Sequence, residues 1–410
     1  MSKLLMFRVL INFVKLTKSD WANMRISHVI IVMLLLATSL FSQTLPQWEV
    51  INKEIPGIND VINIMVADSE GNIYVAGSFT VAGDALAIHV AKWDGEIWSG
   101  LGSDDFPAKG LTGPIESLVC DSDDNLYVGG EFTNSFSGMP LSNIAKWDGT
   151  SWCDLGSGMN DIVANLACDN ENNIYATGDF SRAGGTHVSK IAKWDGTSWS
   201  SLDSVQCNNS CKIACNNNGD LYLSGNFTTG GISYNNIAKW DGSHWTPLSS
   251  GLNTGANIMA FDNNNNLYVG GGSLFPTDSS KNNIAMWDGT SWHSLAHGLN
   301  NIVSSLTVDN EGILYASGDF THSDSIFVGN TAVWDGTTWS TLNIELSTFE
   351  KDTKNSALIV DNSNNLYLSS EFSMINGVTA NNIAKWDGSS WHALGKGMNS
   401  SAITLLLDSL

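Results

Sequence analysis

The chain has 410 residues with 41 acidic and 19 basic side chains, which gives a formal net charge of −22. This charge argues against nucleic acid or an anionic membrane as a partner, because both are polyanions that attract basic surfaces. Glycine is abundant (39 residues) and proline is scarce (7 residues), a composition that suits many short strands joined by tight turns.

The first 42 residues have the features of a targeting segment. Met24, Arg25 and His28 precede the apolar run VIIVMLLLATSLF, and small and polar residues follow it, which is the order of a secretory signal. The run is short for a membrane span. We predict an N-terminal extension and signal peptide at residues 1–42, with Met24 as an alternative start, and a single folded domain at 43–410 without a membrane span.

A unit of 46–54 residues repeats along the rest of the chain. Each copy contains four strand-like pieces, as in IVANLACD (162–169), NIYATGDF (173–180), KIAKWD (190–195) and SWSSL (198–202). Four short antiparallel strands in a repeat of this length are typical of a β-propeller blade. A linear β-solenoid is the competing architecture, but it normally has a shorter repeat and lacks tight hairpins within each unit.

The number of strand copies predicts the number of blades. The second and third pieces occur seven times, whereas the first has an eighth copy at 402–408 and the fourth has one at Trp48. We therefore predict an all-β fold, a β-propeller of seven four-stranded antiparallel blades whose surplus strands cap a closed ring. Eight blades is the alternative if the chain is truncated.

Each copy also contains the motif W-D-G-x-x-W. Glycine followed by another residue between two extended segments favours a two-residue type II′ hairpin, which places Trp147 directly opposite Trp152. Opposed aromatic side chains stabilise a strand pair, so we interpret these pairs as a structural packing device rather than an aromatic platform for sugars. The other pairs are Trp93 and Trp98, Trp194 and Trp199, Trp240 and Trp245, Trp287 and Trp292, Trp334 and Trp339, and Trp386 and Trp391.

Two segments carry a family resemblance. DSEGNIYVAGSF (68–79) and DSDDNLYVGGEF (121–132) resemble the bacterial secreted β-propeller repeat. NIAKWDGTSW (143–152) is similar to the repeats of bacterial surface propellers and of fungal Rax2-like cortical-marker proteins. The resemblance covers about residues 48–408 and implies a bacterial protein that is secreted or displayed at the cell surface.

The turn between the first and second strands is rich in Asp and Asn. In DSDDN, Asp121, Asp123 and Asn125 offer the oxygen ligands that calcium prefers, so calcium is the one metal hypothesis that the sequence supports. The alternative is structural, because Asp and Asn tolerate the left-handed conformation and bond to their own backbone in tight turns. No other cofactor is predicted.

The cysteines divide into two groups. Cys207 and Cys211 lie in the connection that enters the fourth copy, and we expect a local disulfide there because exported proteins form disulfides. Cys120, Cys168 and Cys215 occupy equivalent positions at the ends of consecutive first strands, where we expect them to act as apolar packing residues.

Catalytic motifs are missing from the sequence. It contains no arginine cluster, carboxylate pair or nucleophile motif of the kind that glycosidase chemistry requires. We therefore predict a binding module for an extracellular protein or glycan, not an enzyme. A secreted carbohydrate-active enzyme or lectin-like domain on the same propeller is the alternative.

Strand alternation separates two faces of the ring. The Asp-rich turns and the W-D-G turns share one face, which we expect to be acidic. The connections from strand two to three and from strand four to the next blade share the other face, and they vary in sequence between copies. Such variable loops often form a binding face, although they also vary where nothing constrains them. The candidate contacts are Phe136, Tyr234, Phe275, Phe327 and Phe349.

Overall fold

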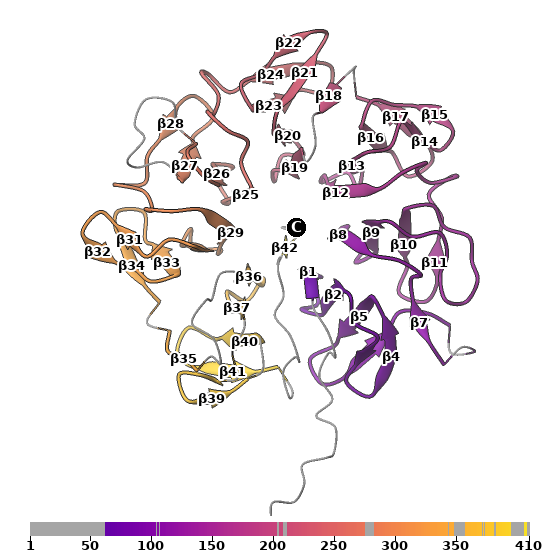
Figure 1. Cartoon of the computed structure of the whole chain (residues 1–410), viewed down its shortest axis with the longest axis horizontal. Coiled ribbons are helices and arrows are strands. Elements are labelled where there is room, and N and C mark those ends of the chain that lie inside the picture. The colour runs from indigo at the N-terminus through magenta and orange to yellow at the C-terminus, as the bar shows by residue number, and fades with distance from the viewer. Residues whose placement is uncertain are drawn as a thin grey trace, which may run out of the picture. The chain divides into compact units, whose positions relative to one another are not determined.

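Seven sheets stand around a ring in the computed structural model (Figure 1). The structure describes residues 62–103, 105, 107–202, 205–207, 211–274, 283–342, 344–347, 357–370, 372, 374–380, 383–394 and 406–407. Over these residues the chain forms strands and turns but no helix, so nothing in them could cross a membrane as a helix. The predicted all-β fold of four-stranded antiparallel blades is confirmed, and the seven sheets are consistent with seven blades.

Each sheet, numbered here as blades 1 to 7 in chain order, has four main strands that pair in sequence order. The first strands are β1 (Ile62–Ala67), β8 (Ile115–Cys120), β12 (Val163–Cys168), β19 (Lys212–Cys215), β25 (Ile258–Phe261), β29 (Val303–Val308) and β36 (Ala357–Val360). The second strands are β2 (Ile73–Gly77), β9 (Leu126–Gly130), β13 (Ile174–Gly178), β20 (Leu221–Ser224), β26 (Leu267–Gly270), β30 (Leu314–Gly318) and β37 (Leu366–Ser369).

The outer half of each blade consists of the third and fourth strands. The third strands are β5 (Val90–Trp93), β10 (Ile144–Trp147), β16 (Ile191–Trp194), β23 (Ile237–Trp240), β27 (Ile284–Trp287), β33 (Thr331–Trp334) and β40 (Ile383–Trp386). The fourth strands are β6 (Trp98–Gly100), β11 (Trp152–Cys153), β17 (Trp199–Ser201), β24 (Trp245–Pro247), β28 (Trp292–His293), β34 (Trp339–Thr341) and β41 (Trp391–Ala393).

The hydrophobic core lies between the blades. Every residue of β2 and β9 is buried, because each sheet is covered on both faces by its neighbours. Tyr127 and Ile144 of blade 2 pack in one cluster with Val163 of blade 3. In the same way Ile359 of blade 7 packs with Met65 of blade 1, so the last blade meets the first and the ring is closed.

One surplus strand is visible. β42 (Leu406–Leu407) pairs in parallel with β1, with Leu406 opposite Val66, and lies near the middle of the ring (Figure 1). The eighth copy of the first strand therefore adds to the inner edge of blade 1 and does not begin another blade within the described residues. The other predicted surplus strand, at Trp48, lies outside the described residues.

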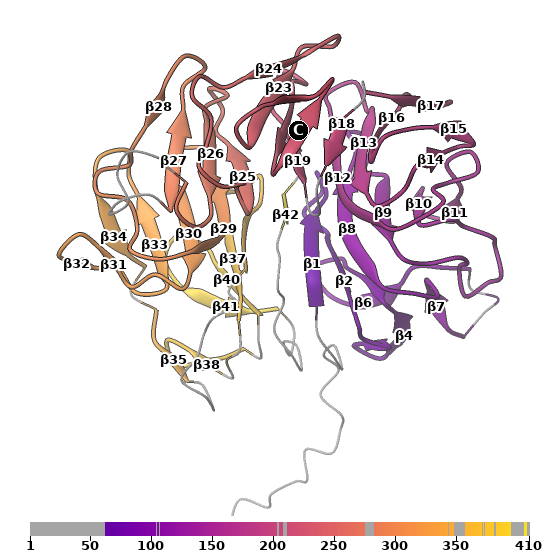
Figure 2. The ribbon, with the colours of Figure 1, turned by 45° about the horizontal axis from the view of Figure 1, so that its top comes forward.

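Short hairpins occupy the connections between the second and third strands, which the sequence analysis treats as loops. They are formed by β3 (Val81–Ala82) and β4 (Ala85–Ile88), β14 (Arg182–Ala183) and β15 (Thr186–His187), β21 (Phe227–Thr229) and β22 (Ile232–Ser233), β31 (His322–Ser323) and β32 (Ile326–Phe327), and β38 (Met374–Ile375) and β39 (Val378–Thr379). Strands β7 (Lys109–Gly110), β18 (Val205–Cys207) and β35 (Leu346–Ser347), from the connections between blades, pair with three of these hairpins, and β35 with β38 marks the lower edge of the ring in Figure 2.

These hairpins fold back over the outer strands. In blade 3, a Cβ atom added at Gly184 would lie 2.8 Å from Cδ1 of Trp199, so this turn sits directly against the outer Trp. The hairpins form because their two-residue turns, such as Gly230-Gly231 and Asn376-Gly377, accept the positive φ angles that tight hairpins need.

The W-D-G motif places its two Trp residues opposite each other. Trp147 pairs with Trp152, and their ring centroids lie 5.3 Å apart. The turn between them contains Gly149 at φ 92°, and the Asp148 carboxylate accepts a hydrogen bond from the backbone N–H of Ser151 at 2.7 Å. The other six pairs repeat this register.

The second Trp also links neighbouring blades. The indole Nε1 of Trp152 donates to the carbonyl oxygen of Leu101 in blade 1 at 3.1 Å, and Trp199 donates to Leu155 in blade 2 at 2.9 Å. The side chains of Trp147 and Trp152 are 7% and 5% exposed, so the pair fills the space between blades and is not an open platform.

We predict that Trp147→Ala lowers the free energy of unfolding by about 3–5 kcal/mol, because it leaves a large cavity between blades 1 and 2. Denaturant unfolding of the purified chain measures this change. Trp240→Ala is the matched control, since Trp240 holds the equivalent position but is half-buried and should cost less. A Trp147→Ala protein as stable as the wild type would contradict the packing role.

Candidate functional site

The connections of the blades lie at two ends of the ring. The Asp-turn end comprises the turns between first and second strands, such as Asp121–Asn125, and the W-D-G turns, such as Asp148–Ser151. The hairpin end comprises the short hairpins and the connections between blades. Antiparallel pairing of all four main strands fixes this division in every blade.

At the Asp-turn end, the first residue of each turn, which is Asn216 in blade 4 and Asp in the other blades, is used by the turn itself. In blade 2, Asp121 Oδ1 accepts hydrogen bonds from the backbone N–H groups of Asp123 at 3.0 Å and Asn125 at 2.9 Å. Asn125 Nδ2 donates to both oxygens of the same carboxylate. Asp121 is 2% exposed, and Lys146 Nζ lies 3.9 Å from Oδ2. These contacts close the turn.

The three residues of the calcium hypothesis therefore lie together, but they face one another through hydrogen bonds. The Asp123 carboxylate accepts from Nδ2 of Asn172 in blade 3 at 3.3 Å. Over the described ranges, no three His, Cys, Asp or Glu side chains are grouped to hold a metal ion. Calcium binding by Asp121, Asp123 and Asn125 stays a prediction that titration of the purified chain would test.

The same turns join neighbouring blades. Ser69 of blade 1 donates its backbone N–H to Asp124 of blade 2 at 2.8 Å, and Ser122 of blade 2 donates its own to Asn172 of blade 3 at 3.0 Å. Asn310 of blade 6 is linked in the same way to Asn364 of blade 7 at 3.0 Å. Side chains at this end thus hold the ring together, and several of its carboxylates are buried rather than available to a partner.

A Tyr lies beneath each of these turns, half-buried at Tyr315 of blade 6 and buried in the other blades. Tyr175 donates its hydroxyl hydrogen to Asp169 Oδ2 at 3.0 Å. In blade 4, burial raises the pKa of Tyr222 to about 12, and the nearby charge of Asp220 adds to the shift, so the hydroxyl stays protonated. Lys239 Nζ lies 5.9 Å from the centre of the Tyr222 ring and 2.7 Å from Asp220. In this arrangement the lysine balances the charge of the carboxylate and the tyrosine keeps its proton, so the three groups have a structural role and none is set to transfer a proton.

The W-D-G carboxylates are exposed, but they also accept hydrogen bonds from their own turns. Hydrogen bonds from the backbone N–H groups of Ser151 and then Thr150 lower the pKa of Asp148 to about 2. The equivalent bonds lower the pKa of Asp195 and Asp241 to about 2. A carboxyl group with so low a pKa is a turn cap and a poor general acid or base near neutral pH.

These depressed pKa values predict acid sensitivity. Because the folded pKa is below the ordinary value of 3.8, the stabilisation by these carboxylates is fully present above about pH 4 and is lost as pH falls toward about 2. We expect the melting temperature to fall steeply in that window, and Asp148→Ala to reduce the slope. Asp154→Ala, an exposed carboxylate in the same blade, is the control and should leave the slope unchanged.

Three W-D-G turns have a histidine in or beside them. His244 lies inside the turn of blade 4, with Nδ1 2.8 Å from Ser243 Oγ, whereas in blades 5 and 7 the histidine follows the second Trp. In blade 5, His293 Nε2 lies 2.6 Å from Asp288 Oδ2 and 3.0 Å from Ser291 Oγ. Blade 7 repeats this with His392 and Asp387. A Ser-His-Asp relay needs the two partners on different ring nitrogens, whereas here both lie at Nε2, so the arrangement is not a catalytic triad.

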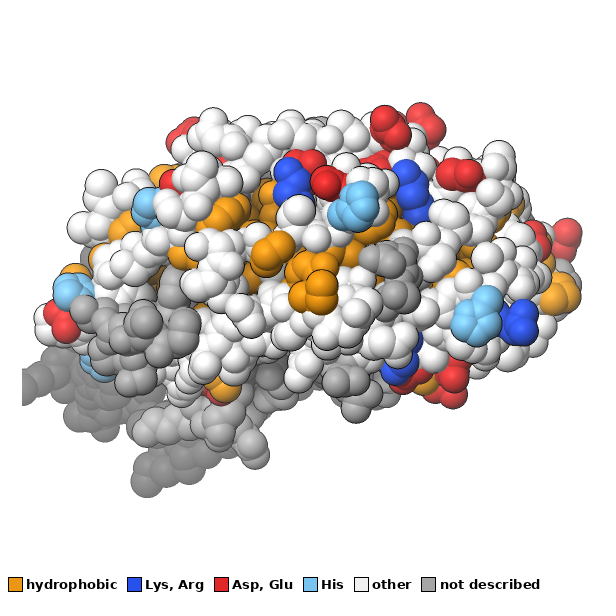
Figure 3. Space-filling model, turned by 90° about the horizontal axis from the view of Figure 1, so that it is seen from above, with side chains coloured by type: hydrophobic (Ala, Val, Ile, Leu, Met, Phe, Trp, Pro, Cys, Tyr) orange, Lys and Arg blue, Asp and Glu red, His pale blue; other side chains and the backbone are white. Residues whose placement is uncertain are grey.

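The hairpin end has a different chemistry. Of the eight large hydrophobic side chains that are exposed within the described residues, seven lie at this end and only Ile97 lies in a W-D-G turn. The seven are Leu86, Phe136, Ile232, Ile302, Ile326, Phe327 and Met374. Hydrophobic side chains are also visible across the middle of the outer edge of the ring (Figure 3). Exposed apolar groups that recur at one end of a domain indicate an interaction surface.

The five predicted contact residues differ in their exposure. Phe136 and Phe327 are exposed, at 39% and 63%. Tyr234, predicted to be exposed, is half-buried because its ring stacks on Phe227 with 5.6 Å between centroids. Phe275 and Phe349 lie outside the described residues.

Five exposed apolar residues of the hairpin end are missing from the sequence prediction: Ile302, Leu86, Ile232, Ile326 and Met374. Ile302 lies at the entry to blade 6, and the other four lie in short hairpins, close to the two-residue turns. For Ile232 and Met374 a signal was present in the turn dipeptides Gly-Gly and Asn-Gly, which mark tight hairpins and so place the residues beside them at exposed tips.

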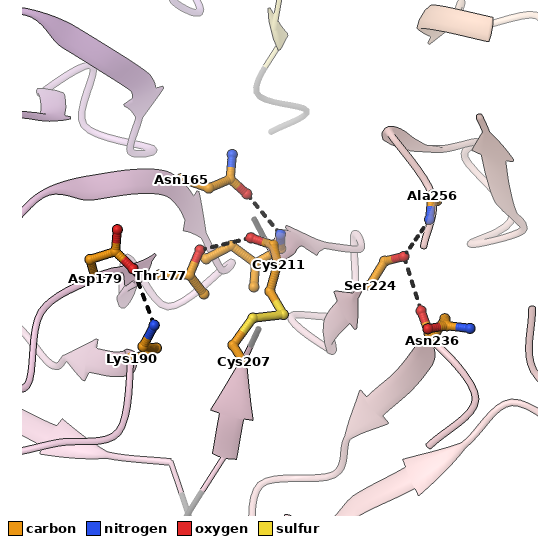
Figure 4. The surroundings of a disulfide bond; sticks show 10 residues. Asn165, Thr177, Asp179, Lys190, Cys207, Cys211, Ser224, Asn236 and Ala256 are labelled. Carbon is orange, nitrogen blue, oxygen red and sulfur yellow. Dashed lines mark hydrogen bonds and ion pairs between the residues drawn. A yellow bond between two sulfur atoms is a disulfide. The ribbon is translucent and has the colours of Figure 1, made fainter. Parts of the chain in front are cut away.

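The predicted disulfide is present in the segment that leads into blade 4. Cys207 and Cys211 are bonded, and the Cys211 carbonyl accepts the Thr177 hydroxyl of blade 3 at 3.1 Å (Figure 4). Nearby, Asn165 Oδ1 accepts the backbone N–H of Ile213 at 2.7 Å. The pair lies in a linker between blades and has a structural role. Cys120 and Cys168 are buried, and Cys215 is half-buried.

Part of the chain matches the model of one protein family. Residues 42–257 match the model of the Rax2 C-terminal beta propeller domain. The chain has no match among curated protein sequences.

Several solved propeller structures are similar at low identity. The extracellular domain of the putative one-component system BT4673 from B. thetaiotaomicron is 14% identical with a TM-score of 0.45, and the match covers 77% of this chain but only 38% of that one. The WD40 β-propeller domain of Doa1 is 12% identical with a TM-score of 0.47, covering 77% and 92%. Virginiamycin B lyase from Staphylococcus aureus is 10% identical with a TM-score of 0.45, covering 79% and 95%. At these identities the similarity concerns the fold alone.

Proposed function

Because this chain belongs to the Rax2 C-terminal β-propeller family, we propose that it is a secreted or cell-surface scaffold that binds an extracellular protein or glycan and carries out no catalysis. The signal-like N-terminus and the excess of acidic residues support export and solubility. The binding surface is the hairpin end of the ring.

The apolar tips of the hairpin end carry this proposal. An exposed Phe or Ile gains nothing from folding, so its repeated presence at equivalent places favours contact with another molecule. Leu86, Ile232 and Phe327 lie on hairpins of three different blades, at 48%, 63% and 63% exposure. The Asp-turn end is less suited to binding, because many of its polar groups are used in turns and between blades.

The lack of catalysis is supported by the state of the polar groups. The most regular carboxylates, such as Asp121 and Asp148, accept hydrogen bonds from their own turns. The His293 and Asp288 pair lacks the geometry of a relay. In the part of the chain that the structure describes, these carboxylate and imidazole groups thus have structural hydrogen-bond partners, which supports a role in the turns rather than in catalysis.

A glycan array and a panel of chromogenic glycosides on the purified chain test this proposal. We expect no hydrolysis, and binding of a glycan or protein that is lost in the triple variant Phe136→Ser, Ile232→Thr, Phe327→His while the melting temperature stays nearly unchanged. Ile97→Thr is the matched control, since Ile97 is equally exposed at the opposite end.

Two results would contradict the proposal. Hydrolysis of any glycoside would favour the alternative of a carbohydrate-active enzyme. Binding that survives the triple variant but is lost in Ile97→Thr would place the surface at the Asp-turn end.

A further inference from the structure

Blade 6 combines apolar exposure with one carboxylate oxygen that has no described partner, on Asp319, a half-buried residue. It carries three of the exposed hydrophobic side chains of the hairpin end, Ile302, Ile326 and Phe327. In the same blade, Oδ1 of Asp319 is buried and has no hydrogen-bond partner among the described residues. A buried carboxylate oxygen without a partner is costly, which makes this position unusual.

Six residues from the entry to blade 6, the end of its second strand and its hairpin are named here the blade-6 patch: Asn300, Ile302, Asp319, His322, Ile326 and Phe327. The backbone N–H of Asp319 donates to the Ile302 carbonyl at 3.0 Å. The backbone N–H of His322 donates to Asn300 Oδ1 at 3.0 Å. The His322 ring meets the Phe327 ring edge-on at 5.4 Å, which connects the linker to the hairpin.

Blade 3 has the same backbone arrangement and serves as an internal reference. Its Asp179 N–H donates to the Ile162 carbonyl at 3.1 Å, as Asp319 donates to Ile302. Here, however, Lys190 Nζ lies 3.1 Å from Asp179 Oδ1 and satisfies the carboxylate (Figure 4). The residues that correspond to Ile326 and Phe327 are the polar Thr186 and His187.

Blade 6 keeps the acid but lacks the internal cation of blade 3. Asn330 stands at the position of Lys190, as Asn143, Asn236 and Asn283 do in blades 2, 4 and 5, and its Nδ2 donates to the Gly318 carbonyl at 3.1 Å instead of reaching Asp319. Blade 6 therefore differs from blade 3 in two ways: the Asp319 carboxylate has no lysine, and two residues of the hairpin in the same blade are exposed apolar side chains.

We propose that the blade-6 patch binds an extended protein segment that places a lysine or arginine against Asp319 and apolar side chains over Ile302 and Phe327. This inference rests on the proposed binding function and names the partner's chemistry. The chain is strongly acidic, with a net charge of −22, and so attracts a basic segment. The hydroxyl groups of a neutral glycan could donate hydrogen bonds to the carboxylate but would bring no opposite charge, and a metal ion would need more ligands than this patch gathers.

The edge of the hairpin supports an extended segment. In blade 1, strand β7 pairs in parallel with the outer edge of β4, with Lys109 opposite Ala87. In blade 6, β32 pairs with β31, and no other described strand joins this sheet. Blade 1 thus shows how a short segment, here Lys109 and Gly110, adds to such an edge, and none of the described strands occupies the equivalent edge of blade 6.

The test uses the full chain and two libraries of ten-residue peptides. Both have randomised Val, Ile and Leu flanks, and the central residue is Lys in one and Glu in the other. Fluorescence polarisation should show binding of the Lys library at least about tenfold tighter than that of the Glu library, since hydrogen bonds to charged groups are among the strongest.

Three variants assign the binding to the patch. Asn330→Lys restores the blade-3 residue and should both weaken binding about tenfold or more and raise the melting temperature, because it pairs Asp319 internally. Asp319→Asn should weaken binding by a similar factor, because it removes the negative charge without introducing a larger side chain. The double variant Ile326→Thr, Phe327→His should weaken it through the apolar contacts. Ser340→Lys, exposed on the fourth strand of the same blade, adds the same charge elsewhere and should leave binding unchanged.

Equal binding of the two libraries, no binding of either, or binding unaffected by Asn330→Lys and Asp319→Asn would overturn the inference. The proposed function would still stand if the triple hairpin variant abolished binding of another protein or a glycan. Hydrolysis of a glycoside would instead count against the proposed function.

Discussion

The structure depends on the contact between one blade and the next. A four-stranded sheet whose second strand is buried along its whole length, as β2 is, has two apolar faces and cannot cover both itself. Each face must therefore meet a neighbouring blade, and seven clusters of buried residues satisfy all the faces only when the ring closes. The pairing of Trp147 with Trp152, and the indole bond to Leu101, fix the outer part of this contact.

This constraint explains why the most regular residues are poor functional candidates. Every blade has a Trp pair, a W-D-G Asp and a Tyr beneath its first turn, and the fold satisfies most of these residues. Trp245 is an exception, because its buried Nε1 has no partner among the described residues. The Tyr175 hydroxyl and the Asp169 carboxylate complete each other, as do Asp148 and the backbone of its turn. Function should appear where one blade departs from the others, and blade 6 does so at Asp319, whose Oδ1 has no partner among the described residues, and at the exposed Phe327.

Much of the fold could be predicted because local chemistry fixes it. The W-D-G-x-x-W spacing determines that Trp147 faces Trp152, and the repeat length indicates blades. The short hairpins were missed because sequence variation suggested loops, although turns such as Gly230-Gly231 favour hairpins. The disulfide between Cys207 and Cys211 was expected from the export signal and is present.

The unsatisfied carboxylate could not be predicted from the sequence. Asp179 and Asp319 both stand in the local sequence Gly-Asp-Phe, so nothing next to them separates the paired acid from the unpaired one. The difference arises eleven residues later, at Lys190 and Asn330, and it matters only because the hairpin returns that residue to the acid. Only a tertiary contact reveals it.

A repeating fold can tolerate a carboxylate without an internal cation, as at Asp319, with only a modest loss of stability. The ring is held by many equivalent contacts, and losing one ion pair at the exposed margin of a single blade leaves the interfaces between blades intact. The bond from the Asp319 N–H to the Ile302 carbonyl holds the backbone of this residue in place. Because Asp319 is half-buried and its Oδ1 is covered, the side chains over Oδ1 would have to move before an external lysine or arginine could pair with that atom. Redundancy among blades thus allows one blade to become a binding site while the other six maintain the fold.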